Sequence, residues 1–293
     1  MMFKIVHKQI IAQDIKRIDI AAPAIAAKVF PGQFVMLTPT AQNRAMPLTV
    51  VDADERKGVI SFIVHEIGPS TAAFGALPIS RPVAGIVGPL GRPAAIDKYG
   101  LVICVATGIG AAQILPICRA LKKKGNRVVG VIGAKSKKVL MLESQMRVVC
   151  DEIFITTNDG SYERKGLATQ VVGELLGKYK VNAIYAIGSV DMMQAATLMA
   201  KDRGIPVRVT LNPYVTNGLG LCGSCRVRVG NEFRLACVDG PEFDGYEVDF
   251  EDLHKRDQVI GEKSWDKQNR PSSPSGGFTA RMKSFWGLGK NKT

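Results

Sequence analysis

The chain has 293 residues, of which 46% are hydrophobic and 22% charged, so it can bury sizeable cores and is not disordered throughout. Lysine and arginine outnumber aspartate and glutamate by 39 to 26, a net charge of +13. Seven of the cations and one of the anions lie in residues 263–293, which leaves only +7 for the rest. Bulk charge therefore does not indicate a nucleic-acid-binding protein, and the length indicates two folded domains with a small appendage.

The N-terminal residues lack a basic stretch followed by an apolar one, so no secretory signal is expected. One uncharged run, residues 101–118, is long and contains Gly108, Gly110 and Pro116. Such residues favour a buried strand, a turn and a helix start over a helix that crosses a membrane. We therefore expect no transmembrane segment and a cytoplasmic location.

Short segments rich in β-branched or aromatic residues fill the first hundred positions. They are Phe3–Lys8, Asp14–Ile20, Gln33–Thr38, Leu48–Asp52 and Val59–Val64. Glycine–proline pairs separate several of them, and a glycine/proline cluster at residues 88–93 closes the region. Five or six such strands without a long helix predict a small antiparallel β-barrel.

From residue 101 onward, apolar strands alternate with helices. The predicted strands are Leu101–Ala106, Arg127–Gly133, Glu152–Thr156 and Asn182–Ile187. The predicted helices are Ala111–Lys124, Val139–Cys150, Lys165–Lys178 and Asp191–Arg203. This alternation is typical of parallel βαβ units and predicts an open nucleotide-binding sheet.

Together these patterns divide the chain into four parts. We predict a β-barrel domain at residues 1–98 and an α/β parallel-sheet domain at 99–210, followed by a small cysteine-bearing segment at 211–256 and a basic, flexible tail at 257–293. The stretch Pro271–Gly277 has the composition of a linker. Apolar residues beyond it fall on helical spacing, so a helix that docks on a partner or on a membrane surface is the alternative to a flexible tail.

The cysteines carry the most specific signal. Two residues separate Cys222 from Cys225, and eleven residues separate Cys225 from Cys237. The other cysteines, Cys104, Cys118 and Cys150, lie singly in apolar segments and are expected in the core. A cytoplasmic chain keeps its thiols reduced, which disfavours disulfides. Plant-type [2Fe–2S] sites use Cys-x4-Cys-x2-Cys with a distant fourth cysteine, and the last three positions fit that spacing.

Asn217 stands where the first cysteine of that pattern would be. Three thiolates with Asn217, or with a neighbouring hydroxyl such as Thr216, can hold an iron–sulfur cluster. A zinc site is the alternative, but it needs four ligands, and the nearby histidine, His254, lies outside the usual spacing. The neutral amide of Asn217 is a weaker donor than an anionic ligand.

A second signal is Gly108-Ile109-Gly110, between a predicted buried strand and a helix. Glycines there let the backbone approach a pyrophosphate at a helix N-terminus. The dinucleotide fingerprint expects an acidic residue near the end of the next strand. This chain instead has Lys135, Lys137 and Lys138, which could hold a phosphate, so both NAD(H) and NADP(H) stay open.

A third signal is Pro47-Leu48-Thr49, preceded by Met46 and by Arg44. Alone it is an ordinary strand start. It suggests a flavin site only in combination with the order of a barrel followed by βαβ units.

The order of these features resembles the ferredoxin–NADP reductase superfamily. Within it, the chain is similar to the electron-transfer subunit of dihydroorotate dehydrogenase and, more closely, to the small subunit of the electron-bifurcating NADH-dependent ferredoxin:NADP oxidoreductase. The segments that carry the resemblance are Gly88–Gly91, TGIGAAQILP, Asn158–Ser161, Gly188–Met193, LNPYVTNGLGLCGSCRVRVG and ACVDGPEFDGYEVDF. The resemblance covers residues 3–256 and leaves out the tail.

The resemblance implies FAD in the barrel, a nicotinamide nucleotide on the sheet domain and a [2Fe–2S] cluster near the C-terminus. By position, Pro47, Leu48 and Thr49, with Arg44 nearby, match the flavin motif, and residues 64–71, with Val64, Gly68 and Thr71, match the segment that faces the flavin phosphates. The implied nucleotide-loop residues are Gly108, Ile109 and Gly110, and those of the nicotinamide-side turn are Gly188 and Met192. The implied cluster ligands are Cys222, Cys225 and Cys237 with Asn217.

The chain departs from the family pattern at three places. Met46 stands where the flavin arginine is usual, so Arg44 must replace that contact or the contact is absent. Gly188-Ser189 replaces a Gly-Pro turn, and Asn217 replaces an aspartate ligand.

The implied function is electron transfer between NAD(P)H, FAD and the cluster, to or from a larger flavin or iron–sulfur subunit. Hydride transfer needs no protein acid or base, so His7 and His65 are expected to be structural. Whether the complex bifurcates electrons is left open. One alternative is a non-catalytic adaptor that keeps the fold without the cluster or flavin, and another is a zinc-bearing nucleotide sensor.

Overall fold

The computed structural model describes residues 3–256, and residues 3–254 of it form one compact unit. The predicted tail at 257–293, with its linker and helix, lies outside the described residues. In the part that is described, no helix has the length and apolar character needed to span a bilayer.

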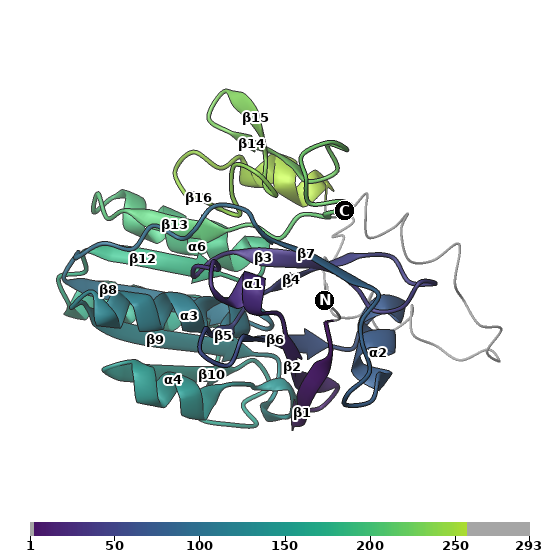
Figure 1. Ribbon diagram of the computed structural model, residues 1–293. Helices are drawn as coiled ribbons and strands as arrows, with labels where there is room; N and C mark the ends of the chain where they lie inside the picture. The colour runs from purple at the N-terminus through teal and green to yellow at the C-terminus, as the bar shows by residue number, and fades with distance from the viewer. Residues whose placement is uncertain (1–2, 257–293) are drawn as a thin grey trace, which may run out of the picture. The chain divides into compact units, whose positions relative to one another are not determined.

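The N-terminal part contains two antiparallel sheets (Figure 1). One has the order β1-β2-β6-β5, with bounds Ile5–Ala12, Ile15–Ala21, Val59–His65 and Asp52–Asp54. The other has the order β4-β3-β7, with bounds Met46–Thr49, Phe34–Thr38 and Gly85–Leu90. Their inner faces share a core that includes Ile18, Val35 and Phe62. The antiparallel β domain is confirmed, but the strand pairings form two sheets, so closure into a barrel is not.

The predicted strand Leu48–Asp52 is wrong, because β4 ends at Thr49 and β5 begins at Asp52 in the other sheet. Val50 and Val51 between them are both buried, and they belong to two different cores. Two consecutive buried residues break the alternation of a strand with one buried face. The chain changes sheets at this point.

Two short helices and one strand of this part were not predicted. The helices are α1 (Pro23–Ala26) and α2 (Pro69–Ala76), each of which starts at a proline. The strand is β7, which contains the glycine and proline residues that indicated a loop, and it pairs with β3 at the edge of its sheet.

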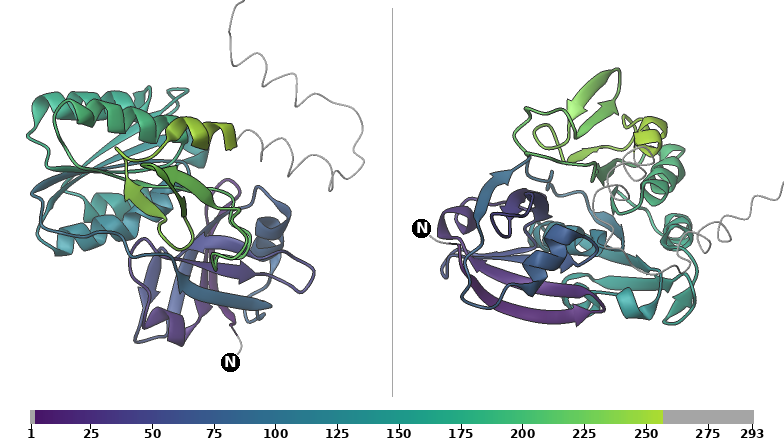
Figure 2. Two further views of the ribbon diagram at one scale, coloured as in Figure 1. Left: turned by 90° about the horizontal axis from the view of Figure 1, so that it is seen from above. Right: turned by 90° about the vertical axis from the view of Figure 1, so that its right-hand side faces the viewer.

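The central part is a seven-stranded sheet of order β11-β10-β9-β8-β12-β13-β16 (Figures 1 and 2). The strands are β8 (Leu101–Thr107), β9 (Arg127–Ala134), β10 (Glu152–Thr157), β11 (Arg164–Lys165), β12 (Ala183–Ile187), β13 (Val207–Thr210) and β16 (Glu242–Asp244). All neighbours are parallel except β13 and β16. The predicted parallel βαβ sheet is confirmed.

Helices cover both faces of this sheet. They are α3 (Gly110–Lys123), α4 (Glu143–Val149), α5 (Ala168–Lys178) and α6 (Val190–Lys201). Along β8, Val102 and Cys104 pack with α3 and α4, whereas Ile103 and Val105 pack with α5 and α6. Because both faces are buried, the strands are continuous apolar runs.

Two predicted helices begin too early. Residues 137–139 form a separate 3₁₀ turn, and the positive φ of Leu142 (60°) delays α4 to Glu143. Arg164–Lys165 instead forms strand β11, and Gly166 has a φ of 140°, so α5 begins at Ala168.

The cysteine-bearing segment continues the sheet domain. It forms the hairpin of β14 (Arg226–Val229) and β15 (Glu232–Leu235), and then adds β16 antiparallel to β13. Its buried residues, among them Val227 and Phe243, belong to the same core as α5 and α6. The boundaries at residues 98 and 210 stay a prediction.

Candidate functional site

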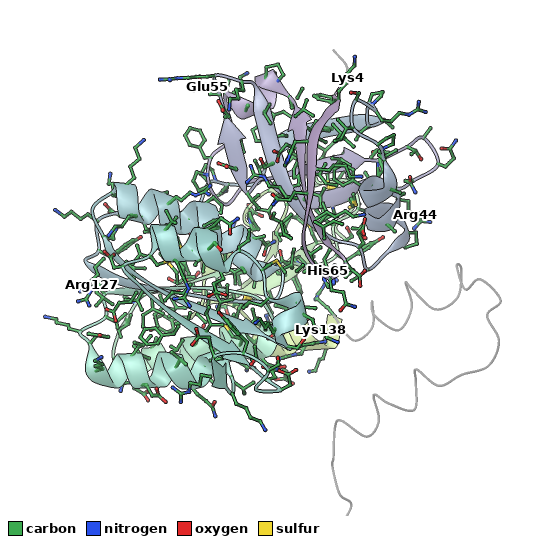
Figure 3. The ribbon with its side chains drawn as sticks, turned by 90° about the horizontal axis from the view of Figure 1, so that it is seen from below. Lys4, Arg44, Glu55, His65, Arg127 and Lys138 are labelled. Carbon is green, nitrogen blue, oxygen red and sulfur yellow. The ribbon has the colours of Figure 1, made fainter. Side chains whose placement is uncertain are left out.

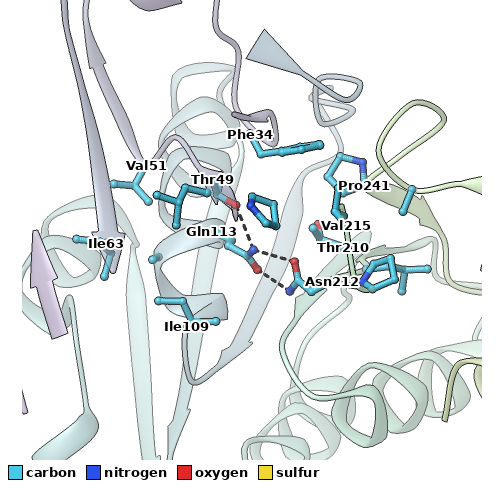
Figure 4. A pocket seen from close by; sticks show the side chains of 16 residues that line it. Phe34, Thr49, Val51, Ile63, Ile109, Gln113, Thr210, Asn212, Val215 and Pro241 are labelled. Carbon is cyan, nitrogen blue, oxygen red and sulfur yellow. Dashed lines mark hydrogen bonds between the residues drawn. The ribbon is translucent and has the colours of Figure 1, made fainter. Parts of the chain in front are cut away.

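A cavity of about 250 Å³ lies where the three parts of the chain meet (Figure 4). The first part lines it with Phe34, Pro47, Leu48, Thr49, Val51 and Ile63. The sheet domain and the cysteine-bearing segment add Ile109, Ala112, Gln113, Thr210, Leu211, Asn212, Pro213, Val215, Ala236 and Pro241. None of these residues, all in the described part of the chain, is ionisable. The cavity therefore suits a mostly apolar ligand, or the apolar part of a larger one.

Three polar side chains form a connected network in the cavity wall (Figure 4). Gln113 Nε2 donates to Thr49 Oγ1 at 3.1 Å and to Asn212 Oδ1 at 2.9 Å. Asn212 Nδ2 donates back to Gln113 Oε1 at 2.9 Å. Gln113 and Asn212 were not predicted, although Gln113 is a polar residue within the apolar run that starts α3. Ile109, Ala112 and Gln113 have the spacing of one helix face.

The three residues implied by the flavin motif lie together on β4. Pro47, Leu48 and Thr49 all line the cavity. Arg44 does not: its side chain is exposed, and its carbonyl accepts a hydrogen bond from Ser70 Oγ at 3.2 Å, beside the start of α2 (Figure 3). The structure thus brings Arg44 near the second implied flavin segment.

That second segment is the start of α2. The Gly68 N–H donates to Thr71 Oγ1 at 2.9 Å, which caps the helix. At the other end, Lys8 Nζ donates to the carbonyls of Gly75 and Leu77, where cations complement the helix dipole. The Val64 side chain is buried in the core of the two sheets, so it is not available to a ligand.

The two glycine turns of the sheet domain lie side by side. In the sheet, β9 and β10 lie on one side of β8, and β12 and β13 lie on its other side, so the order of the strands reverses between β8 and β12. The carboxyl ends of β8 and β12 therefore form the switch point at which open α/β sheets bind ligands. The loop of Gly108, Ile109 and Gly110 follows β8, and Gly188 follows β12.

Close packing explains two of these glycines. A Cβ atom at Gly110 would lie 2.2 Å from the carbonyl oxygen of Ile187, and one at Gly188 would lie 2.0 Å from Thr107 Oγ1. Gly108 has a φ of 56°, and nothing lies within 4 Å of its Cβ position. The space above Gly108 is therefore open to a ligand.

Met192 lies under the second turn. Its side chain is buried, and its Cε lies 3.0 Å from the Cβ position of Gly188. Ser189 caps α6 by accepting a hydrogen bond from the Met192 N–H at 3.4 Å. The Gly-Ser turn thus starts the helix with a hydroxyl cap, which a Gly-Pro turn lacks.

Three lysines, Lys135, Lys137 and Lys138, follow the carboxyl end of β9. Lys135 and Lys138 are exposed, and Lys137 Nζ lies 4.6 Å from the ring centroid of Tyr162. The carboxylate of Asp159 after β10 accepts hydrogen bonds from Ser161, and these lower the pKa of Asp159. Both a cationic and an acidic group are present, so the choice between NADH and NADPH stays open.

The three cysteines of the C-terminal segment have different surroundings. Cys222 is exposed, with its sulfur 3.1 Å from Ser224 Oγ, whereas Cys225 and Cys237 are buried. Hydrogen bonds from Ser224, and weaker ones from Asn217 and Thr216, lower the pKa of Cys222 to about 7. Burial and the neighbouring Cys225 thiol raise the pKa of Cys237 to about 11.

These thiols fit an iron–sulfur cluster in their chemistry. Thiolates are its usual ligands, and the donors around Cys222 stabilise a thiolate. Within residues 3–256 no group of three or more His, Cys, Asp or Glu side chains is arranged to hold one metal ion. A binuclear cluster does not need such a group, because its two irons each take two protein ligands.

Asn217 lies beside Cys222 through its backbone N–H, which helps to lower the Cys222 pKa. Its side-chain Oδ1 accepts a hydrogen bond from the Leu219 N–H at 2.9 Å. The residue therefore lies at the cysteine loop, but its side-chain oxygen is bound to the backbone, and its role as a ligand stays a prediction.

The three remaining cysteines are in the core, as expected, but they are not single. The Cys118 thiol on α3 lies next to the thiols of Cys104 on β8 and Cys150 after α4, and all three are free. This contact with Cys104 raises the pKa of Cys118, and contact with Cys118 raises that of Cys150. Such thiols are inert at neutral pH.

Comparison with known proteins identifies the family. The chain is 37% identical to the dihydroorotate dehydrogenase B (NAD(+)) electron transfer subunit homolog of Thermotoga maritima, over 86% of this chain and 89% of that protein. It is 32% identical to a probable subunit of the same name from Methanopyrus kandleri, over 73% and 78%. The chain belongs to the family of dihydroorotate dehydrogenase B electron transfer subunits.

Within this family, the cysteine-bearing segment has its own match. Residues 212–249 match the iron–sulfur cluster binding domain of dihydroorotate dehydrogenase B. The match begins at the cavity residue Asn212 and contains Asn217 and the three cysteines.

Two solved structures are similar to this chain. A chain of the NADH-dependent reduced ferredoxin–NADP oxidoreductase, a structure that concerns flavin-based electron bifurcation, is 34% identical, with a TM-score of 0.83 over 90% of this chain and 98% of that one. Phthalate dioxygenase reductase is 15% identical, with a TM-score of 0.56 over 78% and 86%, and shows the fold alone.

Proposed function

We propose that this chain is the electron-transfer subunit of a multi-subunit oxidoreductase, in which it passes electrons between NAD(P)H, FAD and a [2Fe–2S] cluster. One observation carries the proposal: β4 of the flavin motif, the glycine loop of α3 and the cysteine-bearing segment all line one cavity. The segments proposed to hold the three cofactors therefore meet at one place in the fold.

Each site fits its group by its chemistry. The apolar cavity without ionisable lining fits a planar flavin ring, and the first turn of α2 would offer the backbone N–H groups of Ser70 and Thr71 to its phosphates. The open space above Gly108 at the switch point fits a dinucleotide. Cys222, Cys225 and Cys237 fit the cluster, with Asn217 as the proposed fourth ligand.

The chemistry that bound FAD supplies is the exchange between hydride transfer and one-electron transfer. The protein contributes position and a dry environment. Pro47, Leu48 and Thr49 would orient the ring, while Phe34 and Ile63 would exclude water from it. Gly188 and Met192 would position the nicotinamide end of the nucleotide.

A larger flavin or iron–sulfur subunit is the proposed partner. Leu219 and Leu221 shortly precede the exposed Cys222 in the chain, and Val238 directly follows Cys237; these three side chains are 52%, 82% and 44% exposed. Exposed apolar side chains next to the proposed cluster suit a protein contact through which an electron leaves. We place this complex in the cytoplasm, since all six cysteines are free thiols.

The test is an anaerobic absorption spectrum with FAD, iron and sulfide quantified on the same sample. We expect one FAD and two each of iron and sulfide per chain, and bands that NADH or NADPH bleaches. Cys222→Ala should lose iron and sulfide but keep FAD, and Cys118→Ala, the matched control, should keep all three. Protein that lacks both groups after supply of iron and FAD would instead indicate the non-catalytic adaptor, and zinc without sulfide would indicate the nucleotide sensor.

A further inference from the structure

We infer that Gln113 is a positioning residue that, braced by Asn212, orients the Thr49 hydroxyl as a hydrogen-bond donor toward the flavin ring. The inference rests on the proposed function, since it needs the cavity to hold that ring. It assigns a role to two residues that the flavin and nucleotide motifs do not include.

The hydrogen-bond pattern sets the direction of the Thr49 hydroxyl. Both hydrogens of Gln113 Nε2 are used, one toward Asn212 Oδ1 and one toward Thr49 Oγ1. Thr49 Oγ1 is therefore an acceptor toward Gln113, and its own hydrogen must point to a different acceptor. Because Thr49 lines the cavity, a bound ring can supply that acceptor.

Asn212 holds the Gln113 amide in place. The two amides exchange hydrogen bonds in both directions, so one cannot rotate without breaking a pair of bonds. The backbone on either side of Asn212 is also fixed. Leu211 is buried and its N–H donates to the Pro241 carbonyl at 2.9 Å, and Pro213 is buried as well.

The surroundings make this one hydrogen bond important. No ionisable side chain lines the described cavity, so no charge there competes with the hydroxyl dipole. In such an apolar site a hydrogen bond is electrostatically stronger than in water. The polarity of a single hydroxyl can then shift the relative stability of two redox states.

The expected effect follows from flavin chemistry. The redox-active ring nitrogen is an acceptor in oxidised flavin, and it carries a hydrogen and becomes a donor after two-electron reduction. A hydroxyl held as a donor therefore stabilises the oxidised ring and lowers the flavin potential. Asn212 is also the first residue of the matched iron–sulfur domain, so the same amide pair connects that domain to the flavin site.

The experiment measures the flavin midpoint potential of the holo-protein by spectroelectrochemistry. Gln113→Leu should raise the potential by about 30 mV, equivalent to a tenfold change in the ratio of oxidised to reduced stability. Thr49→Val should raise it by at least as much, and Gln113→Leu should then add nothing in the Thr49→Val background. Such non-additivity is expected only if Gln113 acts through Thr49.

A control on the same helix separates positioning from structural damage. Arg119 of α3 also bridges to the first part of the chain, through an ion pair with Asp52 at 3.1 Å. Arg119→Gln should leave the potential unchanged. If Gln113→Leu does not fold, Asn212→Ala at an exposed site replaces it, with a smaller shift in the same direction.

Three results would overturn the inference. The first is a lower flavin potential in Gln113→Leu, and the second is an unchanged potential in Gln113→Leu while Thr49→Val shifts the potential. The third is a double variant in which the two shifts add. Each requires flavin in the wild-type protein. A wild-type protein that does not bind FAD would refute the proposed function itself, which keeps the two failures distinct.

Discussion

The hydroxyl of Thr107 accepts a hydrogen bond from the backbone N–H of Ser189 at 3.1 Å, and this bond joins the carboxyl ends of β8 and β12. The same Thr107 oxygen occupies the place where a side chain at position 188 would begin. One threonine therefore holds the two turns of the proposed nicotinamide site together and requires glycine in the second turn.

Gly188→Ala should destabilise the protein and weaken nucleotide binding, because its Cβ would lie 2.0 Å from Thr107 Oγ1. Overpacking of this kind costs about 1–3 kcal/mol in the free energy of unfolding. Denaturant unfolding and NADH titration would measure the two effects. Adding Thr107→Ala should restore part of the stability, and a double variant as unstable as Gly188→Ala would contradict the stated cause.

Glu242 should make stability depend on pH. Its Oε1 accepts a hydrogen bond from the Ala95 N–H at 2.9 Å, while its buried Oε2 has no partner among the described residues. Burial raises the pKa of Glu242 to about 7, although the positive charge of Arg208 acts to lower it. The folded state therefore binds the proton more tightly than the unfolded state, whose pKa is about 4.5.

It follows that the contribution of Glu242 is fully present below pH 4.5 and is lost as pH rises to about 7. The loss is on the order of 3 kcal/mol. Glu242→Gln, which keeps the acceptor for Ala95, should remove this part of the pH dependence. Urea unfolding of both proteins at pH 5.5 and pH 8 checks it, and parallel pH profiles would exclude a titrating Glu242.

Asn217→Asp should lower the potential of the proposed cluster. A carboxylate adds one negative charge beside the cysteine loop and stabilises the oxidised form. A tenfold change in that balance corresponds to about 59 mV for a one-electron couple. Redox titration followed by electron paramagnetic resonance measures the potential, and no fall in it would count against Asn217 as a ligand.

Leu221→Asp should weaken capture of the proposed partner subunit. Leu221 is 82% exposed and adjacent to Cys222, so a charge there would disturb an apolar contact without entering the core. We expect a loss of about tenfold or more in affinity. Co-purification from the native source measures it, with Val148→Asp, a change at an 86% exposed residue of α4, as the matched control. Equal capture by both variants and the wild type would place the partner elsewhere.

Much of the fold was predictable because it depends on residues close in sequence. The alternation of apolar strands and helices predicted β8, β9, β10 and β12 within a residue or two. Helix starts were less predictable. The left-handed conformation of Leu142 and the pairing of Arg164–Lys165 with β10 shorten two helices, and neither has a signal in hydrophobic spacing.

The candidate site was likewise predictable in part from the sequence. Motif spacing indicated Pro47, Leu48 and Thr49, the glycine loop and the cysteines, and the structure places Thr49 and Ile109 in one cavity. It places Arg44 outside that cavity and buries the Val64 side chain. The side of a strand that faces a ligand depends on how the sheets pack, and it cannot be predicted from the position of a residue in a motif.

The sequence by itself determined the family chemistry: a cysteine pattern, a phosphate-binding glycine loop and the order of the parts. Each of these properties depends on a short run of residues, in which the spacing of cysteines or glycines indicates the kind of group that the segment can bind. Only the tertiary structure decided that Gln113 connects Thr49, 64 residues before it, with Asn212, 99 residues after it. It also decided that three apparently isolated cysteines share one core. Contacts over such distances form because the β sheets pack against α3 and the C-terminal segment returns beside β13. This packing cannot be predicted from the spacing of residues that are near one another in the sequence.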